Sequence, residues 1–560
     1  MKKTLALVLA LLLVLSLGLT ACQPKPEEKP VTDPTPTEAP AEEPQGPKIL
    51  RLAEDEPPAL DPQIATDAVS IRLTNLLLEG LVRNHDGKVL PGMAEKWDVS
   101  ADGLTYTFHL RDAKWSDGKP VTAYDFEYSW RRIVDPKVAS EYAFQGYYLK
   151  NGEEINTGKI TDLTQLGVKA TDEKTLVATL KAPCSYFLSL CGFVTFQPAR
   201  QDKVEEFKEA YGTDVDKYVT NGPFLFKEWV HDSHFSIEKN PDYWNKDAIK
   251  LDKIEYTIVV DAATIINMYE AGDIDMCGLT GDYIQQFKDK GREVKSYSDG
   301  AEFYLEVNHK GKTAETGKFL GNNDFRLALG YALDRQALIT AILKNDSKPA
   351  TRFVHPDLAG VNDKFANEHP YEFWPATADL AKAKEHLDKA LAAIGTTADK
   401  MPTFELLNYE GDNARLFGEA LQDMWLKNLG VKVEMKQIQF AQKLQIATDK
   451  DYDLNYAGWG PDYNDAMTFV DLFVTDGGHN NTNWSNAKFD ELIYGAKVEA
   501  DPVKRGQMMA EAEKILLEGV PCIPLYFRYR NYTHQPYVTG VVRYPIGADP
   551  DLVYADILPH

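Results

Sequence analysis

The sequence lacks the motifs by which most hydrolases and metalloenzymes are recognised. Its 560 residues contain neither HExxH, which binds zinc in many proteases, nor GxSxG, which holds the nucleophile of many esterases. The five cysteines form no CxxC pair, so neither a zinc ribbon nor a redox dithiol is indicated. Residues 311–318 place five residues between two glycines where a phosphate loop has four. We therefore expect no enzymatic activity, no cofactor and no metal site.

Positive charge is scarce as well. The chain has 61 Lys and Arg against 85 Asp and Glu, which gives a formal net charge of -24. Such a balance argues against nucleic acid and other polyanions as partners. The apolar run at residues 4–19 is shorter than the roughly 20 residues that a membrane-spanning helix needs.

The N-terminus instead has the pattern of a secretory signal peptide. Lys2 and Lys3 precede the apolar run, which ends in Leu19-Thr20-Ala21-Cys22. This ending resembles the lipobox of bacterial lipoproteins, and the resemblance implies cleavage after residue 21 and lipidation of Cys22. The alternative is an uncleaved anchor with an incidental cysteine. Residues 22–47 are rich in Pro and Glu and have no aromatic residue, so we expect a disordered stalk that tethers the protein to the membrane.

Downstream of the stalk, strand and helix patterns alternate. Residues 404–407 and 431–435 have the pattern of strands on either side of a helix at residues 412–429, which Gly430 would end. A second helix is predicted at residues 380–394, with Leu380 on its apolar face and Gly395 as its C-cap, and a third at residues 324–343. This rhythm predicts an α/β fold, and the length allows two or three domains.

One stretch has the composition of a ligand site. Gly458 and Gly460 leave the backbone bare on both sides of Trp459, and Asp462 follows after Pro461. A glycine-lined strand edge, an aromatic wall and one carboxylate suit an extended ligand with a positively charged end. The alternative is a hairpin turn with a buried Trp and a solvated Asp.

The same stretch carries a family resemblance. Ala457-Gly458-Trp459 and Asp462-Tyr463-Asn464 resemble the ligand loop of the oligopeptide-binding proteins of ABC importers, and residues 107–130 are similar to the signature of the peptide/nickel type of solute-binding proteins. The resemblance implies a bilobal periplasmic-binding-protein type II fold with an extra subdomain and two crossover strands. Lobe I would comprise residues 48–78, 200–300 and 530–560, the accessory subdomain residues 79–199, and lobe II residues 301–529.

The resemblance also implies which residues bind a peptide. Asp462 would take the α-ammonium group, and the backbones at Gly458, Trp459 and Gly460 would pair with the peptide backbone. Further contacts would come from Thr66, Asp67, Ala68, Tyr142, Tyr304, Glu306, Asn481 and Thr482. For Thr66 to Ala68 the alternative is a simple strand-to-helix loop, and for Tyr142 a partly buried side chain.

The far end of the ligand is where this chain departs from its relatives. Enteric members carry basic groups at positions that here are Tyr456 and Ala414, so the resemblance predicts that the peptide's carboxylate is not clamped. Arg415, Lys443 and Arg528 are candidates to take over that role, but the sequence does not place them in the cleft. Cys184 and Cys191 are interpreted as buried thiols, and Cys277 and Cys522 receive no role.

Together these features predict a lipid-anchored extracytoplasmic receptor that captures oligopeptides. Its expected partners are an ABC permease with its ATPase subunits, and the membrane through the lipid anchor only; we expect a monomer. Three alternatives stay open: a receptor of the same fold for a dipeptide, nickel, haem or an oligosaccharide, a secreted peptidase, or a peptide chaperone.

Overall fold

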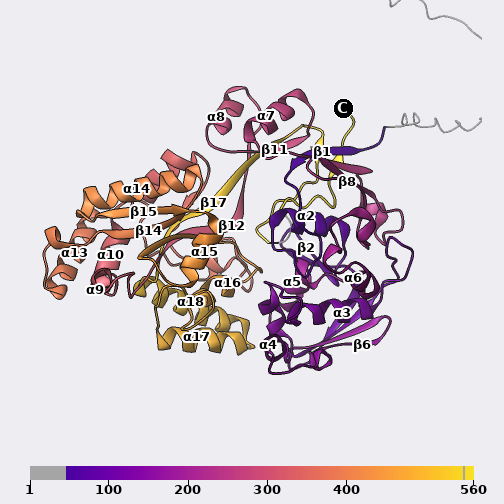
Figure 1. Cartoon of the computed structure of the whole chain (residues 1–560), viewed down its shortest axis with the longest axis horizontal. Helices are drawn as coiled ribbons and strands as arrows, with labels where there is room; N and C mark the ends of the chain where they lie inside the picture. The colour runs from indigo at the N-terminus through magenta and orange to yellow at the C-terminus, as the bar shows by residue number, and fades with distance from the viewer. Residues whose placement is uncertain (1–45, 547–548) are drawn as a thin grey trace, which may run out of the picture. The chain divides into compact units, whose positions relative to one another are not determined.

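The computed structural model describes residues 46–546 and 549–560. The predicted signal peptide, Cys22 and most of the predicted stalk lie outside these residues. Within the unit Pro47–His560 the chain is a mixture of helices and sheets, and it divides into two lobes, drawn largely in purple and in orange to yellow (Figure 1). No helix of the described part combines the length and the hydrophobicity that crossing a membrane requires.

The first lobe contains a four-stranded sheet in the order β1-β10-β9-β8. Its strands are β1 (Ile49–Glu54), β8 (Phe224–Val230), β9 (His234–Lys239) and β10 (Lys253–Ile258). Only β1 and β10 run parallel; the other pairs are antiparallel. After β1 the chain enters α2 (Ala68–Leu77), whose first turn is capped by Asp67: its carboxylate accepts from the Ser70 N–H at 2.8 Å. The short strands β18 (Val538–Thr539) and β19 (Asp556–Ile557) come from the C-terminal segment.

Between α2 and β8 the chain builds a second, antiparallel sheet in the order β4-β5-β7-β6. It is formed by β4 (Ala94–Val99), β5 (Thr105–Leu110), β6 (Val168–Asp172) and β7 (Thr175–Thr179), next to the hairpin β2 (Val82–His85) and β3 (Lys88–Pro91). The helix α3 (Ala123–Val134) begins with a capping box, in which Asp125 accepts from the Thr122 N–H at 2.8 Å. Shorter helices follow at α4 (Gly152–Asn156), α5 (Phe187–Cys191) and α6 (Gln201–Phe207).

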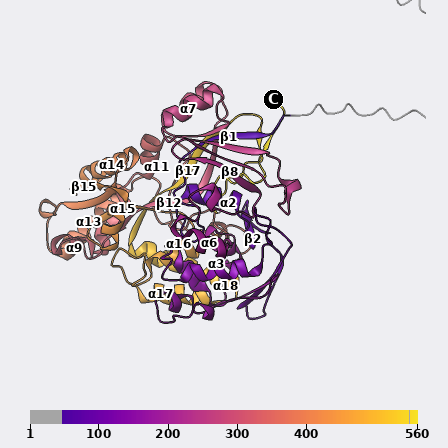
Figure 2. The same ribbon diagram turned by 45° about the vertical axis from the view of Figure 1, so that its right-hand side comes forward.

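The seven-stranded sheet is centred on two long strands, β12 (Lys295–Val307) and β17 (Cys522–His534), which are antiparallel neighbours. The remaining strands are β11 (Met276–Leu279), β13 (Lys348–Pro349), β14 (Phe404–Tyr409), β15 (Val433–Ile438) and β16 (Leu454–Trp459). At thirteen residues each, β12 and β17 extend over roughly 40 Å. They run from one lobe to the other, and Figure 2 shows the same crossing from a second direction.

Helices pack around this sheet, and two of them end where glycine was predicted to end them. These are α13 (Leu380–Ile394) and α14 (Asp412–Leu429), followed by Gly395 and Gly430 with φ of 74° and 69°. The others are α7 (Ala262–Ala271), α8 (Asp282–Asp289), α9 (Ala314–Leu320), α12 (Phe365–Glu368), α15 (Phe440–Thr448), α16 (Met467–Val470), α17 (Ala487–Val498) and α18 (Pro502–Gly519).

Two predictions in this region were wrong. The expected helix at residues 324–343 is three pieces, α10 (Asn323–Tyr331), α11 (Arg335–Leu338) and a π-helical turn (Ile339–Leu343). The break occurs because Asp334 accepts from the Ala337 N–H and so starts a new helix. Leu380, placed on the apolar face of its helix, is 50% exposed because it sits in the first turn, beyond the packed face.

Candidate functional site

The strand β16 leads into the predicted ligand loop with one edge unpaired. On one side, residues 454–459 pair in register with β12, so that Trp459 lies opposite Glu302. On the other side, β14 pairs only with Leu454 and Asn455. The backbone beyond Asn455 therefore has no strand partner on that side in the described part of the chain. An extended chain could add to this edge as a further strand.

A cavity of about 640 Å³ adjoins this edge. Six predicted site residues line it: Tyr304, Glu306, Gly458, Trp459, Gly460 and Asn481. Sequence analysis missed other lining residues, chiefly the aromatic side chains Phe303, Tyr409 and Phe440 and the imidazole of His479. Tyr409 ends β14 and Phe440 follows β15. The signal for them was available, because the carboxyl ends of neighbouring parallel strands are a common place for ligands.

Asp462 follows Gly460 by two positions but does not itself line this cavity, and it has an unusual environment. Its backbone N–H donates to the Thr468 hydroxyl at 3.2 Å, and the same hydroxyl accepts from the Trp459 indole at 3.3 Å. Its carboxyl group has no hydrogen bond or ion pair with any residue that the structure describes. Burial, and secondarily the negative charge of Asp471, raise the pKa of Asp462 to about 7. A cation brought next to this group would restore its charged form.

Tyr142, which lies in residues 79–199, is within electrostatic range of this carboxyl. Burial, and next the charge of Asp462, raise the pKa of Tyr142 to about 12. The structure thus brings Tyr142 and Asp462 into electrostatic reach of one another, although they are 320 positions apart.

Of the other predicted residues, one lines a cavity, one caps a helix and one is fully buried. Thr66 and Ala68 are exposed, and Ala68 lines a second cavity of about 550 Å³, which shares Asp299 and Arg528 with the first. The carboxylate of Asp67 caps α2, and Asp67 does not line the second cavity. Thr482 does not line the first cavity: it is fully buried and its hydroxyl donates to Asn480 at 2.8 Å.

Inside the first cavity, the buried acid Glu306 is held by uncharged donors. Its Oε2 atom accepts from the Asn455 amide at 2.6 Å and from the Tyr452 hydroxyl at 3.3 Å. Burial raises the pKa of Glu306 despite these hydrogen bonds. Tyr304, its neighbour on β12, is buried edge-to-face against Phe353 with ring centroids 5.3 Å apart.

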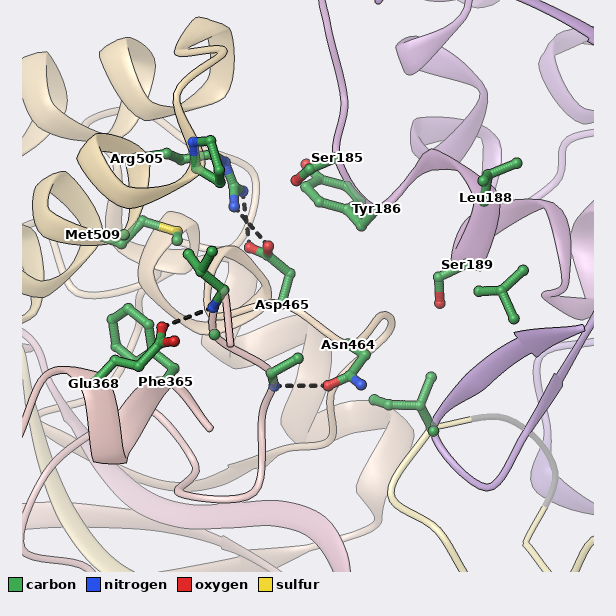
Figure 3. Close-up of a pocket in the computed structure, with 18 of the residues that line it drawn as sticks. Ser185, Tyr186, Leu188, Ser189, Phe365, Glu368, Asn464, Asp465, Arg505 and Met509 are labelled. Carbon is green, nitrogen blue, oxygen red and sulfur yellow. Dashed lines mark hydrogen bonds and ion pairs between the residues drawn. The ribbon is translucent and has the colours of Figure 1, made fainter. Parts of the chain in front are cut away.

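The ligand loop also lines a different cavity, of about 490 Å³, through Asn464 and Asp465 (Figure 3). Its other walls include residues 185–189 and Arg505. Its charged groups are paired. Arg505 donates to both carboxylate oxygens of Asp465, at 2.6 and 2.8 Å, and the backbone N–H of Ala359 donates to Asn464 at 2.9 Å. Tyr186 stacks on Tyr463 with ring centroids 4.1 Å apart, which joins the accessory part of the chain to the ligand loop.

The four described cysteines are buried and free, which confirms the interpretation of Cys184 and Cys191 as buried thiols.

Comparison with known proteins supports one family throughout. Residues 88–481 match the model of the bacterial extracellular solute-binding proteins, family 5 middle. The chain is 36% identical over 498 residues to the oligopeptide-binding protein OppA of Bacillus subtilis, covering 87% of this chain and 88% of that protein. It is 35% identical over 518 residues to the dipeptide-binding protein DppE of the same organism, with 91% and 92% covered.

A solved structure shows the same fold. Listeria monocytogenes OppA bound to peptide matches with a TM-score of 0.76 and 34% identity, over 92% of this chain and all of that one. The predicted α/β, bilobal fold of the type II periplasmic binding proteins is thereby confirmed. The predicted segment bounds of the lobes stay a prediction.

Proposed function

Because the chain belongs to family 5 of the bacterial extracellular solute-binding proteins, we propose that it is an extracytoplasmic receptor that encloses oligopeptides between its lobes and delivers them to an ABC importer. This family consists of binding proteins rather than enzymes. The loaded receptor would bind the importer's permease with its ATPase subunits, and the receptor itself would act as a monomer.

The observation that carries the proposal is the unpaired carboxyl of Asp462 beside the unpaired edge of β16. A peptide enclosed between lobes loses water from its backbone, so its N–H and C=O groups need new partners. Backbone pairing along residues 456–460 provides them for almost any peptide sequence. The peptide's α-ammonium would then form a charge-assisted hydrogen bond with Asp462.

Lobe closure would be linked to this contact through the aromatic residues next to it. Tyr463 follows Asp462 directly and stacks on Tyr186 of the accessory part, and His479 lies edge-on to both Trp459 and Phe144. A ligand that orders the loop around Asp462 would therefore favour the arrangement in which these rings meet. The closed form would be what the permease recognises.

The membrane tether belongs to the same proposal. Residues 1–21 would be removed, Cys22 would carry the lipid, and residues 22–47 would act as a spacer of roughly 25 Å as a flexible coil. Cys22→Ala should release the protein into the soluble fraction while peptide affinity is unchanged. A Cys22→Ala protein that has lost its signal peptide and still sediments with membranes would contradict the lipoprotein assignment.

The function itself is tested by calorimetry with tetra-alanine and its N-acetylated form. Tetra-alanine should bind, and the acetylated peptide should bind much more weakly, because it offers no ammonium to Asp462. Equal binding of the two would exclude the proposed role of Asp462. Peptide that is recovered intact after long incubation separates a receptor from a peptidase.

The resemblance to a dipeptide-binding protein makes ligand length a real question. Mass spectrometry of ligands that copurify with the protein distinguishes oligopeptides from dipeptides and from non-peptide ligands.

A further inference from the structure

A lysine that forms no ion pair with any described side chain lines the cavity beside Trp459. Lys443, on α15, is only 3% exposed and lines the cavity with Glu306 and Tyr456. Its ammonium group forms no ion pair or hydrogen bond with any side chain that the structure describes. Burial lowers the pKa of Lys443. A buried ammonium with no partner is costly, which is why such groups are normally paired.

Glu306 is the acidic group whose charge acts on Lys443, where it opposes the lowering of the Lys443 pKa by burial. The two form no ion pair, and Glu306 is engaged by Asn455 and Tyr452. Burial also favours the uncharged form of Glu306, since its pKa is raised. The positive charge of Lys443 is thus left available to the cavity.

The second cation of this cavity differs in this respect. Arg528 donates to Asp299 at 2.7 Å and lies over the ring of Phe303. Its charge is compensated within the chain, and Asp299 also accepts from Arg530 at 2.6 Å. Of the two cations that line this cavity, Lys443 is the one without an ion pair among the described side chains, and an anionic ligand could provide one.

We propose that Lys443 binds a carboxylate of the bound peptide, at the end of the cavity away from Asp462. The inference rests on the proposed function, because it presupposes a peptide that enters along β16. It replaces the expectation that the ligand's negative end is unclamped with a specific partner. The carboxylate could be the C-terminus of a short peptide or an acidic side chain of a longer one; both present the same chemistry to the ammonium group.

The apolar surroundings support a carboxylate carried on a peptide rather than a free anion. Phe440 and Leu444 lie on the same helix, line the same cavity and are 56% and 48% exposed. They would be covered by the ligand's side chains while its carboxylate reaches Lys443. A small inorganic anion would leave these surfaces in water.

The test compares Lys443→Met, which keeps the length and removes the charge, with Lys443→Arg, which keeps the charge. Lys432→Met, on the exposed loop before β15, is the matched control. The probes are tetra-alanine as free acid and as amide, and two amidated variants with Glu or Gln at the third position. Calorimetry gives the affinities, and thermal unfolding of the unliganded proteins reports on structure.

We expect Lys443→Met to weaken binding of at least one carboxylate-bearing probe by about tenfold to a hundredfold, the scale of a hydrogen bond to a charged group. Binding of the amidated Gln peptide should be unchanged. A loss that disappears on amidation identifies the C-terminus, and a loss specific to Glu over Gln identifies an acidic side chain. Lys443→Arg should retain most of the affinity, and Lys443→Met should melt no lower than the wild type.

Three outcomes would overturn the inference. One is an equal loss for all four probes, which indicates a structural role; another is no loss for any. A carboxylate-specific loss in Lys432→Met as well would point to general charge instead of this site. If the wild type binds none of the peptides, the proposed function fails and this inference fails with it. If the wild type binds them and Lys443→Met leaves every affinity unchanged, only this inference is overturned.

Discussion

Two aspartates of the ligand loop, Asp465 and Asp462, have opposite environments. Asp465 faces the cavity of Figure 3, where Arg505 binds both of its oxygens. Asp462, three residues earlier, lines neither that cavity nor the one beside Trp459, and its carboxyl has no hydrogen bond or ion pair with a described side chain. Both are largely removed from water, yet only one has its charge satisfied within the chain. The comparison separates a carboxylate that holds the structure together from one that is left for a ligand.

The same contrast recurs among the cations. Arg505 and Arg528 are each paired with an aspartate, whereas Lys443 has no such partner among the described side chains. An unpaired buried charge lowers stability, so a protein is expected to keep one only where something else depends on it. Asp462 and Lys443 are therefore expected to lower the stability of the folded protein, whereas the Arg505–Asp465 ion pair stabilises the loop.

The largest effect should come from breaking the paired side. Asp465→Asn leaves the buried guanidinium of Arg505 without its counter-ion, and we expect the free energy of unfolding to fall by roughly 3–5 kcal/mol. Urea denaturation of the unliganded protein measures this. Arg505→Met combined with Asp465→Asn should recover part of the loss; a double variant as unstable as the sum of the two single variants would show that the ion pair is not the cause.

The matching change on the unpaired side should act on binding instead. Asp462→Asn should weaken binding of tetra-alanine by about 3 kcal/mol, since it removes one member of a desolvated charge pair. The unliganded variant should be at least as stable as the wild type at pH 8, because no buried negative charge remains. A drop in stability comparable to that of Asp465→Asn would show that Asp462, like Asp465, stabilises the folded protein.

The pH dependence of binding sharpens the comparison further. With the pKa of Asp462 at about 7 in the unliganded protein, affinity for tetra-alanine should fall as the pH decreases below that value, by about tenfold per unit. It should also decline above pH 8, where the peptide's amino group loses its proton. Calorimetry from pH 5 to 9 should give a bell-shaped profile, and Asp462→Asn should lose its acidic limb.

The same shift predicts an unusual trend in stability. An ordinary aspartate titrates near 3.8, so between that value and about 7 the native protein binds a proton that the unfolded chain does not. The contribution of Asp462 to stability should then decrease as the pH rises through this window. The difference in unfolding free energy between wild type and Asp462→Asn, followed over the same range, isolates it; a difference that does not vary with pH would contradict the raised pKa.

The smallest effect concerns the contact that joins the loop to the accessory part of the chain. Tyr186→Leu removes the ring that stacks on Tyr463, and we expect it to weaken peptide binding by about 0.5–1.5 kcal/mol. Tyr186→Phe keeps the ring and loses only the hydroxyl contact with Tyr148, so it serves as the control. If Phe and Leu behave alike, stacking does not stabilise the closed form.

Local signals predicted much of the fold correctly. The ends of α13 and α14 followed from Gly395 and Gly430, because a residue with positive φ ends a helix whatever surrounds it. The broken helix after α10 could not be read in the same way. Arg335 is fully buried and donates to the carbonyl oxygen of Pro524 on β17, nearly two hundred residues away, and a periodic pattern contains no trace of that contact.

For the candidate site, the sequence by itself determined the chemical groups: the glycines, the indole and the carboxyl between Gly458 and Asp462. Only the tertiary structure decided which charges are compensated. Arg505 forms an ion pair with Asp465 from forty residues away, and Asp299 pairs with Arg528. The carboxyl of Asp462 and the ammonium of Lys443 form no ion pair with any side chain that the structure describes. Desolvation and pairing depend on what packs around a group in space, and neighbours in sequence carry little of that information.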